Sequence, residues 1–243
     1  MSLQSPSIVL TRDQVGNARL EALLNIPKEQ FVSFDLFDAT FQLDALPAIE
    51  SPIIITSRYA AQYCITLDIP TNSAFYVVGK EVAHIITEYQ LGKLAYVAEN
   101  VDELLHILQQ QAKHQHLTYL RGQYISQDIK TILSPANIHI DEHIVYQLHA
   151  VDKAAEQLQA FIGDAQSPIL LPLLSKRTAA VISELVFEVQ PRAAIYAVAL
   201  SESVMQSVKT YAWAGQFIAK KATMDSLASA CMNGCNSISH LAP

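Results

Sequence analysis

Two halves of this chain carry the same short motifs in the same order. Four residue pairs mark the repeat, and the offset between partners rises along the chain from 109 to 123. The pairs are Arg12 with Arg121 (offset 109), Ser57 with Ser175 (118), Gly79 with Ala199 (120) and Asp102 with Asp225 (123). A period above one hundred residues is too long for a solenoid, so it predicts two similar domains. Small molecules often bind in the cleft that two domains form, and we expect such a site here.

The composition is typical of a globular protein with a large core. Of the 243 residues, 51% are apolar and 16% are charged, which argues against a disordered chain. This length suits one large domain or two smaller ones. The formal net charge of -7 argues against nucleic-acid binding, although a locally basic site could still hold an anionic ligand.

Cysteine usage and the start of the chain indicate a cytoplasmic protein. Cys64, Cys231 and Cys235 do not have the even number and spacing of a disulfide framework, as expected in a reducing compartment. The first residues carry neither the basic region nor the apolar stretch of a signal peptide. No apolar run approaches the ~20 residues of a membrane-spanning helix, so we expect no membrane association.

Short apolar runs alternate with stretches of helical periodicity. This alternation predicts an α/β protein whose parallel sheets are covered by helices on both faces. The predicted buried strands are 8–10, 53–55, 74–78, 117–120, 169–174 and 193–199.

Two further segments, 31–37 and 143–148, alternate apolar and polar residues and predict strands with one wet face. If they pair, they form a two-stranded bridge, and the middle of the chain is an insert. The repeat alone leaves a simple cut near residue 115 as the alternative. In the insert arrangement, domain A comprises 1–30 and 150–243, domain B comprises 42–142, and the connecting ladder comprises 31–41 and 143–149.

The repeated motifs lie where a predicted strand ends and a helix begins. In open α/β sheets, ligands bind beyond the carboxyl ends of the strands, where helix N-termini present N–H groups that suit carboxylates and phosphates. Taken singly, serines at such places are most often helix caps, and arginines are solvated or structurally paired. Recurrence at the same edge of both domains favours an anion site. The hydroxyls and cations concerned are those of Arg12, Thr56, Ser57, Arg58, Arg121, Ser175, Lys176 and Arg177.

Motifs for other chemistries are missing from the sequence. There is no G-x-G-x-x-G after a strand, no G-x-x-x-x-G-K-[ST] and no G-x-S-x-G, so dinucleotide, Walker-type and nucleophile-elbow sites have no support. No set of histidines, cysteines and carboxylates has a metal-ligand spacing. We therefore expect neither a metal nor a cofactor.

Taken in order, the motifs resemble those of the uroporphyrinogen-III synthase family over nearly the whole chain. The interval from Gly122 to Tyr146 also fits the family layout. The resemblance implies two flavodoxin-like parallel-sheet domains, joined by a two-stranded ladder, with the active site in the cleft between them. It thus favours the insert over the simple cut. The segments that carry the resemblance are 10–12, 55–61, 78–80, 98–105, 120–122, 145–146, Ser175 with the helix after it, and 222–227.

The resemblance also implies a substrate and a reaction. Family members act on hydroxymethylbilane, a linear tetrapyrrole with acetate and propionate groups on every ring. They remove its terminal hydroxyl as water, invert ring D and close the macrocycle without a cofactor. The free substrate closes unaided to the wrong isomer, so the enzyme must control conformation, and two hinged domains suit that task. The implied setting is tetrapyrrole and haem biosynthesis, with a cytoplasmic monomer that contacts the preceding pathway enzyme at most transiently.

The resemblance assigns roles to individual residues. Tyr146 is implied as the acid that assists departure of the hydroxyl. The sequence departs from the family pattern at two places. Ala199-Leu200-Ser201-Glu202 replaces a Gly-Pro-Thr-Thr-like turn and adds a carboxylate, and Ser126 stands where the family often has Arg. The altered turn leaves a non-catalytic binding protein for a tetrapyrrole or other anionic ligand as the alternative. The implied substrate-binding residues are Arg12, Thr56, Ser57, Arg58, Gly79, Lys80, Arg121, Gly122, Ser175, Lys176 and Ser201.

Overall fold

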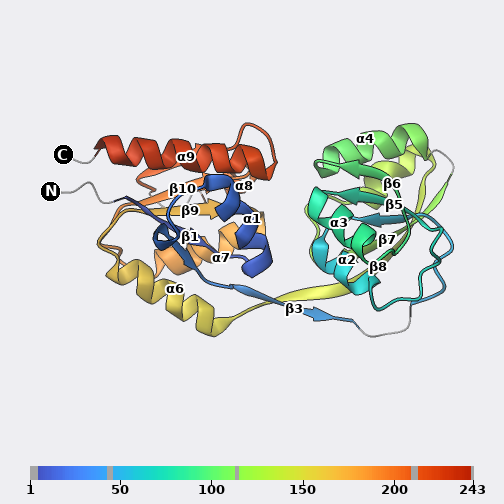
Figure 1. Cartoon of the computed structure of the whole chain (residues 1–243), viewed down its shortest axis with the longest axis horizontal. Coiled ribbons are helices and arrows are strands. Elements are labelled where there is room, and N and C mark those ends of the chain that lie inside the picture. Colours follow the sequence, from blue (N-terminus) through green and yellow to red (C-terminus); the bar gives the residue numbers. More distant parts are fainter. Residues whose placement is uncertain (1–4, 43–45, 113–114, 209–212, 242–243) are drawn as a thin grey trace. The chain divides into compact units, whose positions relative to one another are not determined.

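The chain divides into two compact units in the computed structural model, which describes residues 5–42, 46–112, 115–208 and 213–241 (Figure 1). Unit 1 comprises Met1–Asp38 and Ala150–Pro243, and unit 2 comprises Ala39–His149. Each unit contains a largely parallel sheet between two layers of helices, which confirms the predicted α/β class. Among the described residues, no helix combines the length and apolar character needed to cross a bilayer.

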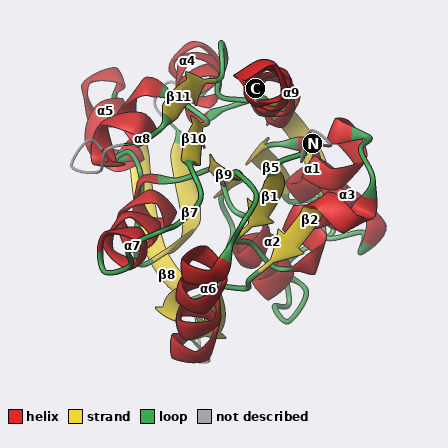
Figure 2. Cartoon of the chain, turned by 90° about the vertical axis from the view of Figure 1, so that its left-hand side faces the viewer, coloured by secondary structure: helices red, strands yellow, loops and turns green. Residues whose placement is uncertain are grey.

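Unit 1 is built on a five-stranded sheet of order β11-β10-β9-β1-β2, whose pairs are parallel (Figure 2). Alternate strand residues pack against different helices. One face packs against α6, α7 and α8, and the other packs against α1 and α9. The strands are β1 (Ser7–Leu10), β2 (Phe31–Ser33), β9 (Ile169–Leu173), β10 (Ile195–Ala199) and β11 (Gly215–Ile218); the helices are α1 (Gln14–Leu24), α6 (Asp152–Asp164), α7 (Lys176–Phe187), α8 (Glu202–Met205) and α9 (Met224–Leu241), with 3-10 turns at Lys28–Gln30 and Gln206–Val208.

Unit 2 is built on a six-stranded sheet of order β3-β8-β7-β4-β5-β6. Helices α2 and α3 cover one face, and α4 and α5 cover the other. The strands are β3 (Phe37–Phe41), β4 (Ile53–Ile55), β5 (Ala74–Val78), β6 (Lys93–Ala98), β7 (His116–Gly122) and β8 (His139–Ala150); the helices are α2 (Arg58–Cys64), α3 (Lys80–Glu88), α4 (Val101–Gln111) and α5 (Ile129–Leu133), with a 3-10 turn at Ser134–Ala136.

The two sheets have the same strand order when strands are numbered within each half of the repeat. The edge strand β3, which is found only in the sheet of unit 2, is left out of this numbering. The first half then supplies β1, β2, β4, β5 and β6, and the second supplies β7 to β11, as strands 1 to 5 of each half. Unit 1 then has the order 2-1-3-4-5, with strands 1 and 2 from the first half and 3 to 5 from the second. Unit 2 has the same order with the origins reversed. This is the flavodoxin-like order. The halves have exchanged their first two strands, so each unit contains strands from both.

Strand register supports the equivalence of the two halves. It also corrects one of the four repeat pairs predicted from the sequence, Gly79 with Ala199. Val77 in β5 pairs with Ile55, two residues before the capping Ser57. Ala199 in β10 pairs with Leu173, two residues before the capping Ser175. Ala199 is therefore equivalent to Val77. The repeat partner of Gly79 is Ser201, and both occupy the N-cap position of a helix.

The expected two-stranded ladder is shorter than the sequence pattern suggests. β3 neighbours β8, and the two run antiparallel, since the Leu36 carbonyl accepts from the Val151 N–H while the Gln42 N–H donates to the Val145 carbonyl, each at 3.0 Å. Phe31–Ser33 lies outside this pair, because it is β2 and pairs in parallel with β1. An edge strand also has a wet side, so alternation alone could not separate the two cases. A simple cut near residue 115 does not match the sheet, in which β4 and β7 are neighbours.

Candidate functional site

Each sheet has a point where the chain connections lead away in opposite directions. In unit 1 this point lies between β1 and β9, and in unit 2 between β4 and β7. Open α/β sheets bind ligands beyond the carboxyl ends of the strands at such a point. Arg12 and Ser175 follow the two strands in unit 1, while Ser57 follows β4 and Gly122 ends β7 in unit 2. The structure thus brings these predicted site residues to the carboxyl edge of the sheet in their own unit.

In unit 2, Tyr146 is held against the first turn of α2. Its Oη donates to Ser57 Oγ at 2.8 Å, and its ring packs on that of Tyr59 with centroids 5.3 Å apart. Ser57 is also the N-cap of α2 and accepts from the Tyr59 backbone N–H at 3.3 Å. The structural and functional interpretations of Ser57 are therefore compatible, because the cap also holds the phenol in place.

Gly122 makes room for the Tyr146 phenol. A Cβ at Gly122 would lie 2.5 Å from Tyr146 Cζ and 2.7 Å from Tyr146 Oη, closer than real Cβ contacts. The strand pairing that aligns Gly122 with Tyr146 also contains an irregularity at this point. A side chain at position 122 would therefore displace the phenol.

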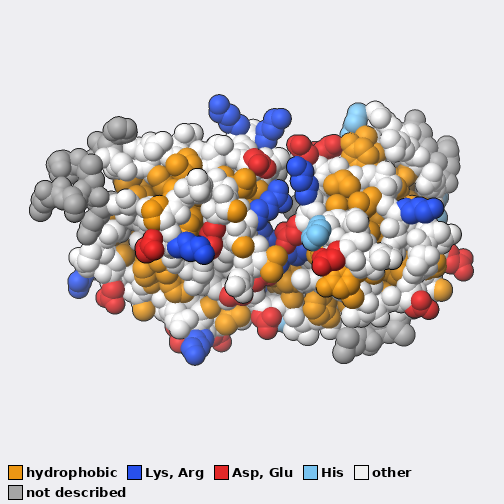
Figure 3. Space-filling model, viewed as in Figure 1, with side chains coloured by type: hydrophobic (Ala, Val, Ile, Leu, Met, Phe, Trp, Pro, Cys, Tyr) orange, Lys and Arg blue, Asp and Glu red, His pale blue; other side chains and the backbone are white. Residues whose placement is uncertain are grey.

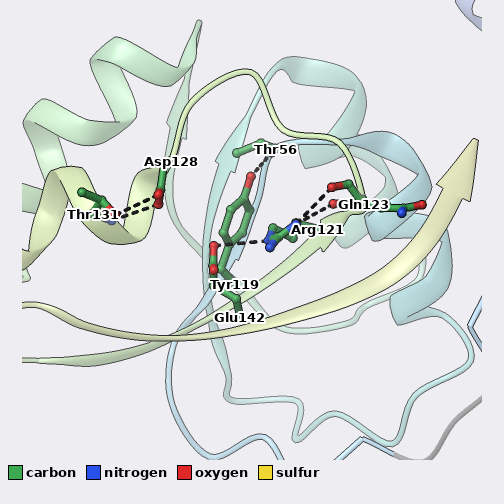
Figure 4. A network of polar contacts seen from close by, with 8 residues as sticks. Thr56, Tyr119, Arg121, Gln123, Asp128, Thr131 and Glu142 are labelled. Carbon is green, nitrogen blue, oxygen red and sulfur yellow. Dashed lines mark hydrogen bonds and ion pairs between the residues drawn. The ribbon is translucent and has the colours of Figure 1, made fainter. Parts of the chain in front are cut away.

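A second tyrosine holds the adjacent hydroxyl (Figure 4). The hydroxyls of Thr56 and Tyr119 lie 2.9 Å apart, and Tyr119 is almost completely buried in β7. Burial raises the pKa of Tyr119 to about 12, with smaller effects in the same direction from Tyr146 and Glu142. Two consecutive hydroxyls after β4 are thus each positioned by a tyrosine from a neighbouring part of the sheet.

We expect the buried Tyr119 phenol to make stability fall steeply at high pH. In the unfolded chain a tyrosine ionises near its ordinary pKa of 10.0, whereas in the folded chain Tyr119 stays protonated until about 12. Its stabilising effect is therefore complete below pH 10 and is lost as the pH rises through 12. Between pH 10 and 12, the free energy of unfolding measured in urea should fall by about 2–3 kcal/mol more for the wild type than for Tyr119→Phe. Tyr89→Phe, at an exposed site, is the control, and identical profiles for all three proteins would contradict the prediction.

Arg58, predicted to bind substrate, is buried in unit 2. Its side chain is 5% exposed, and Nη1 lies 3.7 Å from Glu81 Oε1. Nη2 donates to Tyr59 Oη at 2.8 Å, and the guanidinium lies 4.5 Å from the centroid of the Tyr59 ring. The cation therefore fixes Tyr59, on which Tyr146 packs, and links the first turn of α2 to that of α3.

Removing the Glu81 charge should destabilise the protein. Glu81→Gln removes the carboxylate charge that lies 3.7 Å from the buried Arg58 guanidinium, and we expect a loss of about 1–2 kcal/mol in the free energy of unfolding. Glu88→Gln is a matched control on the same helix, because Glu88 is half-exposed and pairs with the exposed His84. That change should stay within about 0.5 kcal/mol. Equal effects of the two substitutions in urea unfolding would show that the Arg58 pair is not stabilising.

Arg121 is also engaged within its own unit (Figure 4). Its Nε lies 3.2 Å from Glu142 Oε1, and its Nη1 donates to the carbonyl oxygens of Gly122 at 3.0 Å and Gln123 at 3.4 Å. Tyr119 and Glu142 are partners in the parallel pair of β7 and β8, so the carboxylate comes from the strand register. The guanidinium therefore holds the end of β7, at Gly122, and the start of the turn that follows it.

Gly79 and Lys80 start helix α3 at the same edge. Gly79 has φ 88°, in the left-handed region that favours glycine, and it supplies no side-chain cap. The first N–H groups of α3 are consequently not capped by the Gly79 side chain, and Lys80 adds an exposed ammonium beside them. Backbone donors and a cation together suit a carboxylate.

In unit 1, Ser175 and Lys176 occupy the start of α7. Ser175 Oγ accepts from the Thr178 N–H at 3.1 Å, so Ser175 is an N-cap like its repeat partner Ser57. Ser175 and Lys176 are exposed, whereas the Arg177 guanidinium lies 4.9 Å from the centroid of the Phe37 ring. Lys176 is thus the cation of this turn that faces solvent most openly.

Arg12 and Ser201 are the remaining predicted substrate-binding residues of unit 1. The Arg12 guanidinium lies over Gly16 in the first turn of α1, where a Cβ would come within 2.8 Å of it. Asn17 bonds both backbone groups of Arg12 and so holds the turn after β1. Ser201 Oγ lies 3.1 Å from Ser203 Oγ, and it precedes Glu202, which accepts from Gln206 at 3.3 Å.

No metal site is found in the described ranges 5–42, 46–112, 115–208 and 213–241, where no three His, Cys, Asp or Glu side chains are grouped to hold an ion. A surface cavity lined by His116, His139, Asp141 and Lys130 lies elsewhere. His116 and His139 begin β7 and β8, so this cavity is at the opposite edge from the strand-end motifs. It does not contain the predicted site residues.

Fold and strand-end chemistry together define an α/β protein of two flavodoxin-like units, each with hydroxyl and cationic side chains beside its topological switch point. A family model described as uroporphyrinogen-III synthase HemD matches residues 38–229. The chain belongs to this family. No curated protein sequence matches the chain.

The comparison with solved structures concerns the fold alone. The uroporphyrinogen-III synthetase of Helicobacter pylori is 15% identical, with 94% of this chain and 99% of that chain covered and a TM-score of 0.63. A mutant uroporphyrinogen III synthase of Thermus thermophilus is 11% identical, with coverages of 95% and 99% and a TM-score of 0.49. The first of these likenesses shows the shared fold.

Proposed function

We propose that this protein closes hydroxymethylbilane to uroporphyrinogen III with loss of water. The observation that carries the proposal is the Tyr146 phenol, which Gly122 admits and Ser57 holds at the switch point of unit 2. Family membership supports the substrate class, and a phenol held at the carboxyl edge of the sheet supports the choice of Tyr146 as the weak acid.

In the proposed reaction, Tyr146 donates its proton to the terminal hydroxyl of the substrate. The carbon–oxygen bond breaks, the electron pair leaves with water, and the pyrrole nitrogen supplies electrons to form an azafulvene. The α-carbon of ring D that carries the bridge to ring C attacks the azafulvene carbon, which gives a spiro intermediate. The bond from that α-carbon to the ring C bridge then breaks, and the bridge carbon bonds to the free α-carbon of ring D, so that ring D is inverted. The proton released from this second α-carbon restores the neutral phenol. While Tyr146 is ionised, the Ser57 hydroxyl can donate to the phenolate, because it lies 2.8 Å away. Oxidation states balance without a redox partner, so we propose a cofactor-independent lyase.

We propose that backbone N–H groups and exposed lysines bind the substrate carboxylates. The starts of α3 and α7 offer donors beside Lys80 and Lys176, respectively. Arg58 and Arg121 serve a different purpose, since each already pairs with a carboxylate of its own unit and holds a turn in place. Few free cations are needed, because helix N-termini attract anions on their own.

The test is an isomer assay with freshly generated hydroxymethylbilane. The enzyme product is oxidised to the porphyrin, and types I and III are separated by chromatography. We expect type III to predominate, against type I in the enzyme-free control. Type I alone would contradict the proposal, and tetrapyrrole binding without ring closure would instead identify a non-catalytic binding protein.

A further inference from the structure

An exposed apolar side chain stands three residues after each strand-end arginine. Val15 follows Arg12 and Tyr124 follows Arg121, so the two positions share the repeat offset of 109. Val15 is 60% exposed and Tyr124 is 65% exposed. The two halves of the chain therefore place apolar groups in solvent at equivalent positions.

Both positions lie at the ligand-binding edge of their own unit. Val15 is in the first turn of α1, directly beyond the carboxyl end of β1. Tyr124 lies in the connection from β7 to α5, two residues after Gly122, and its neighbour Ile125 is also exposed. Strands β1 and β7 are the equivalent strands at the two switch points.

Exposure alone does not distinguish these residues. Hydrophobic side chains are scattered among charged ones over the face seen in Figure 3. Phe187, which is 75% exposed, is the last residue of α7, and that helix runs back from the carboxyl edge of the sheet. Phe187 therefore lies at the opposite edge. What sets Val15 and Tyr124 apart is that their exposure recurs at the edge where ligands bind.

We propose that Tyr124 and Val15 bind the apolar faces of the substrate's pyrrole rings. This inference rests on the proposed function and adds to it the part of the substrate that the anion-binding turns do not recognise. Acetate and propionate groups lie at the ring edges, where backbone N–H groups and lysines can bind them, while the ring faces offer only π surface. A tyrosine ring stacks well on such a surface, and a branched aliphatic side chain packs against it.

The test is fluorescence titration with uroporphyrin III, the stable oxidised form of the product, at two salt concentrations. We expect Tyr124→Ala to weaken binding about tenfold and Val15→Ala about threefold. Tyr124→Phe should bind within about twofold of the wild type, because it keeps the ring. The salt dependence should be the same in all variants, since no charge is removed. Phe187→Ala is the matched control and should bind as the wild type does, and circular dichroism checks that each variant is folded.

Two outcomes separate this inference from the proposed function. If Tyr124→Ala and Val15→Ala both bind the porphyrin as tightly as the wild type, the inference is overturned, whatever the isomer assay shows. If the wild type forms only the type I isomer, the proposed function fails, and the porphyrin titrations still decide whether these side chains bind tetrapyrrole rings. Weakened binding in Phe187→Ala equal to that in Tyr124→Ala would also overturn the inference, because binding would not depend on the strand-end edge.

Discussion

Tyr146→Phe is expected to lower kcat by about 100-fold or more while the protein stays folded. The substitution removes only the hydroxyl that donates to Ser57, and general acid catalysis typically contributes a rate factor of this size. The ring keeps its packing on Tyr59, so the free energy of unfolding should change by about 1 kcal/mol or less. Single-turnover kinetics with hydroxymethylbilane and urea unfolding measure the two quantities.

Tyr76→Phe is the matched control for this experiment. Tyr76 and Tyr146 are each 8% exposed and belong to the same sheet, but Tyr76 lies in β5, away from the switch point. We expect Tyr76→Phe to leave kcat within about twofold of the wild type. Full activity in Tyr146→Phe, or an equal loss in both variants, would remove the Tyr146 hydroxyl from the mechanism.

Gly122→Ala is expected to reduce kcat at least about tenfold through Tyr146. The added methyl would lie 2.5 Å from Tyr146 Cζ, and the phenol must move away from Ser57 to admit it. Because a side-chain end can move at modest cost, the free energy of unfolding should fall by only about 1–2 kcal/mol. In a Tyr146→Phe background the same change should have little further effect on kcat, since both substitutions act through one hydroxyl.

Gly163→Ala supplies the control for the glycine substitution. Gly163 lies in α6 of unit 1, and a Cβ there would meet Val189 at an ordinary distance of 3.4 Å. Alanine favours the helix, so this variant should be unchanged or up to about 1 kcal/mol more stable, with normal kcat. If Gly122→Ala and Tyr146→Phe reduce kcat additively, the glycine does not act by positioning the phenol.

Much of the fold follows from local sequence patterns, and the elements that were missed have a common physical cause. The buried strands were predicted because their apolar runs are continuous. β6 and β11 were not predicted, and both are edge strands. Gln216 interrupts the apolar residues of β11, whereas the apolar run of β6, residues 94–98, is continuous but mostly exposed.

In the candidate site, too, some features could be predicted from local sequence and others could not. At the strand ends, the residue types of Ser57 and Ser175 allowed either a helix cap or an anion site, and the anion site was predicted. The structure shows that both serines are caps, and their role in binding an anion stays a prediction. Tyr119 was not recognised, because nothing local separates it from other buried tyrosines until strand pairing brings its hydroxyl to Thr56. The partners of Arg58 and Arg121 were missed for a related reason, since Glu81 begins another helix and Glu142 lies in another strand.

The sequence by itself determined the duplication, the parallel α/β class, and the presence of hydroxyls and cations where strands give way to helices. These features depend on residue spacing within short segments, which a linear pattern records. The repeat alone left the simple cut near residue 115 open, and the family resemblance favoured the insert. Only the tertiary structure showed which strands the halves exchange, that carboxylates hold two arginines, and that Gly122 faces Tyr146. Each of these depends on the register between strands and helices distant in the chain, and register is set by how the core packs.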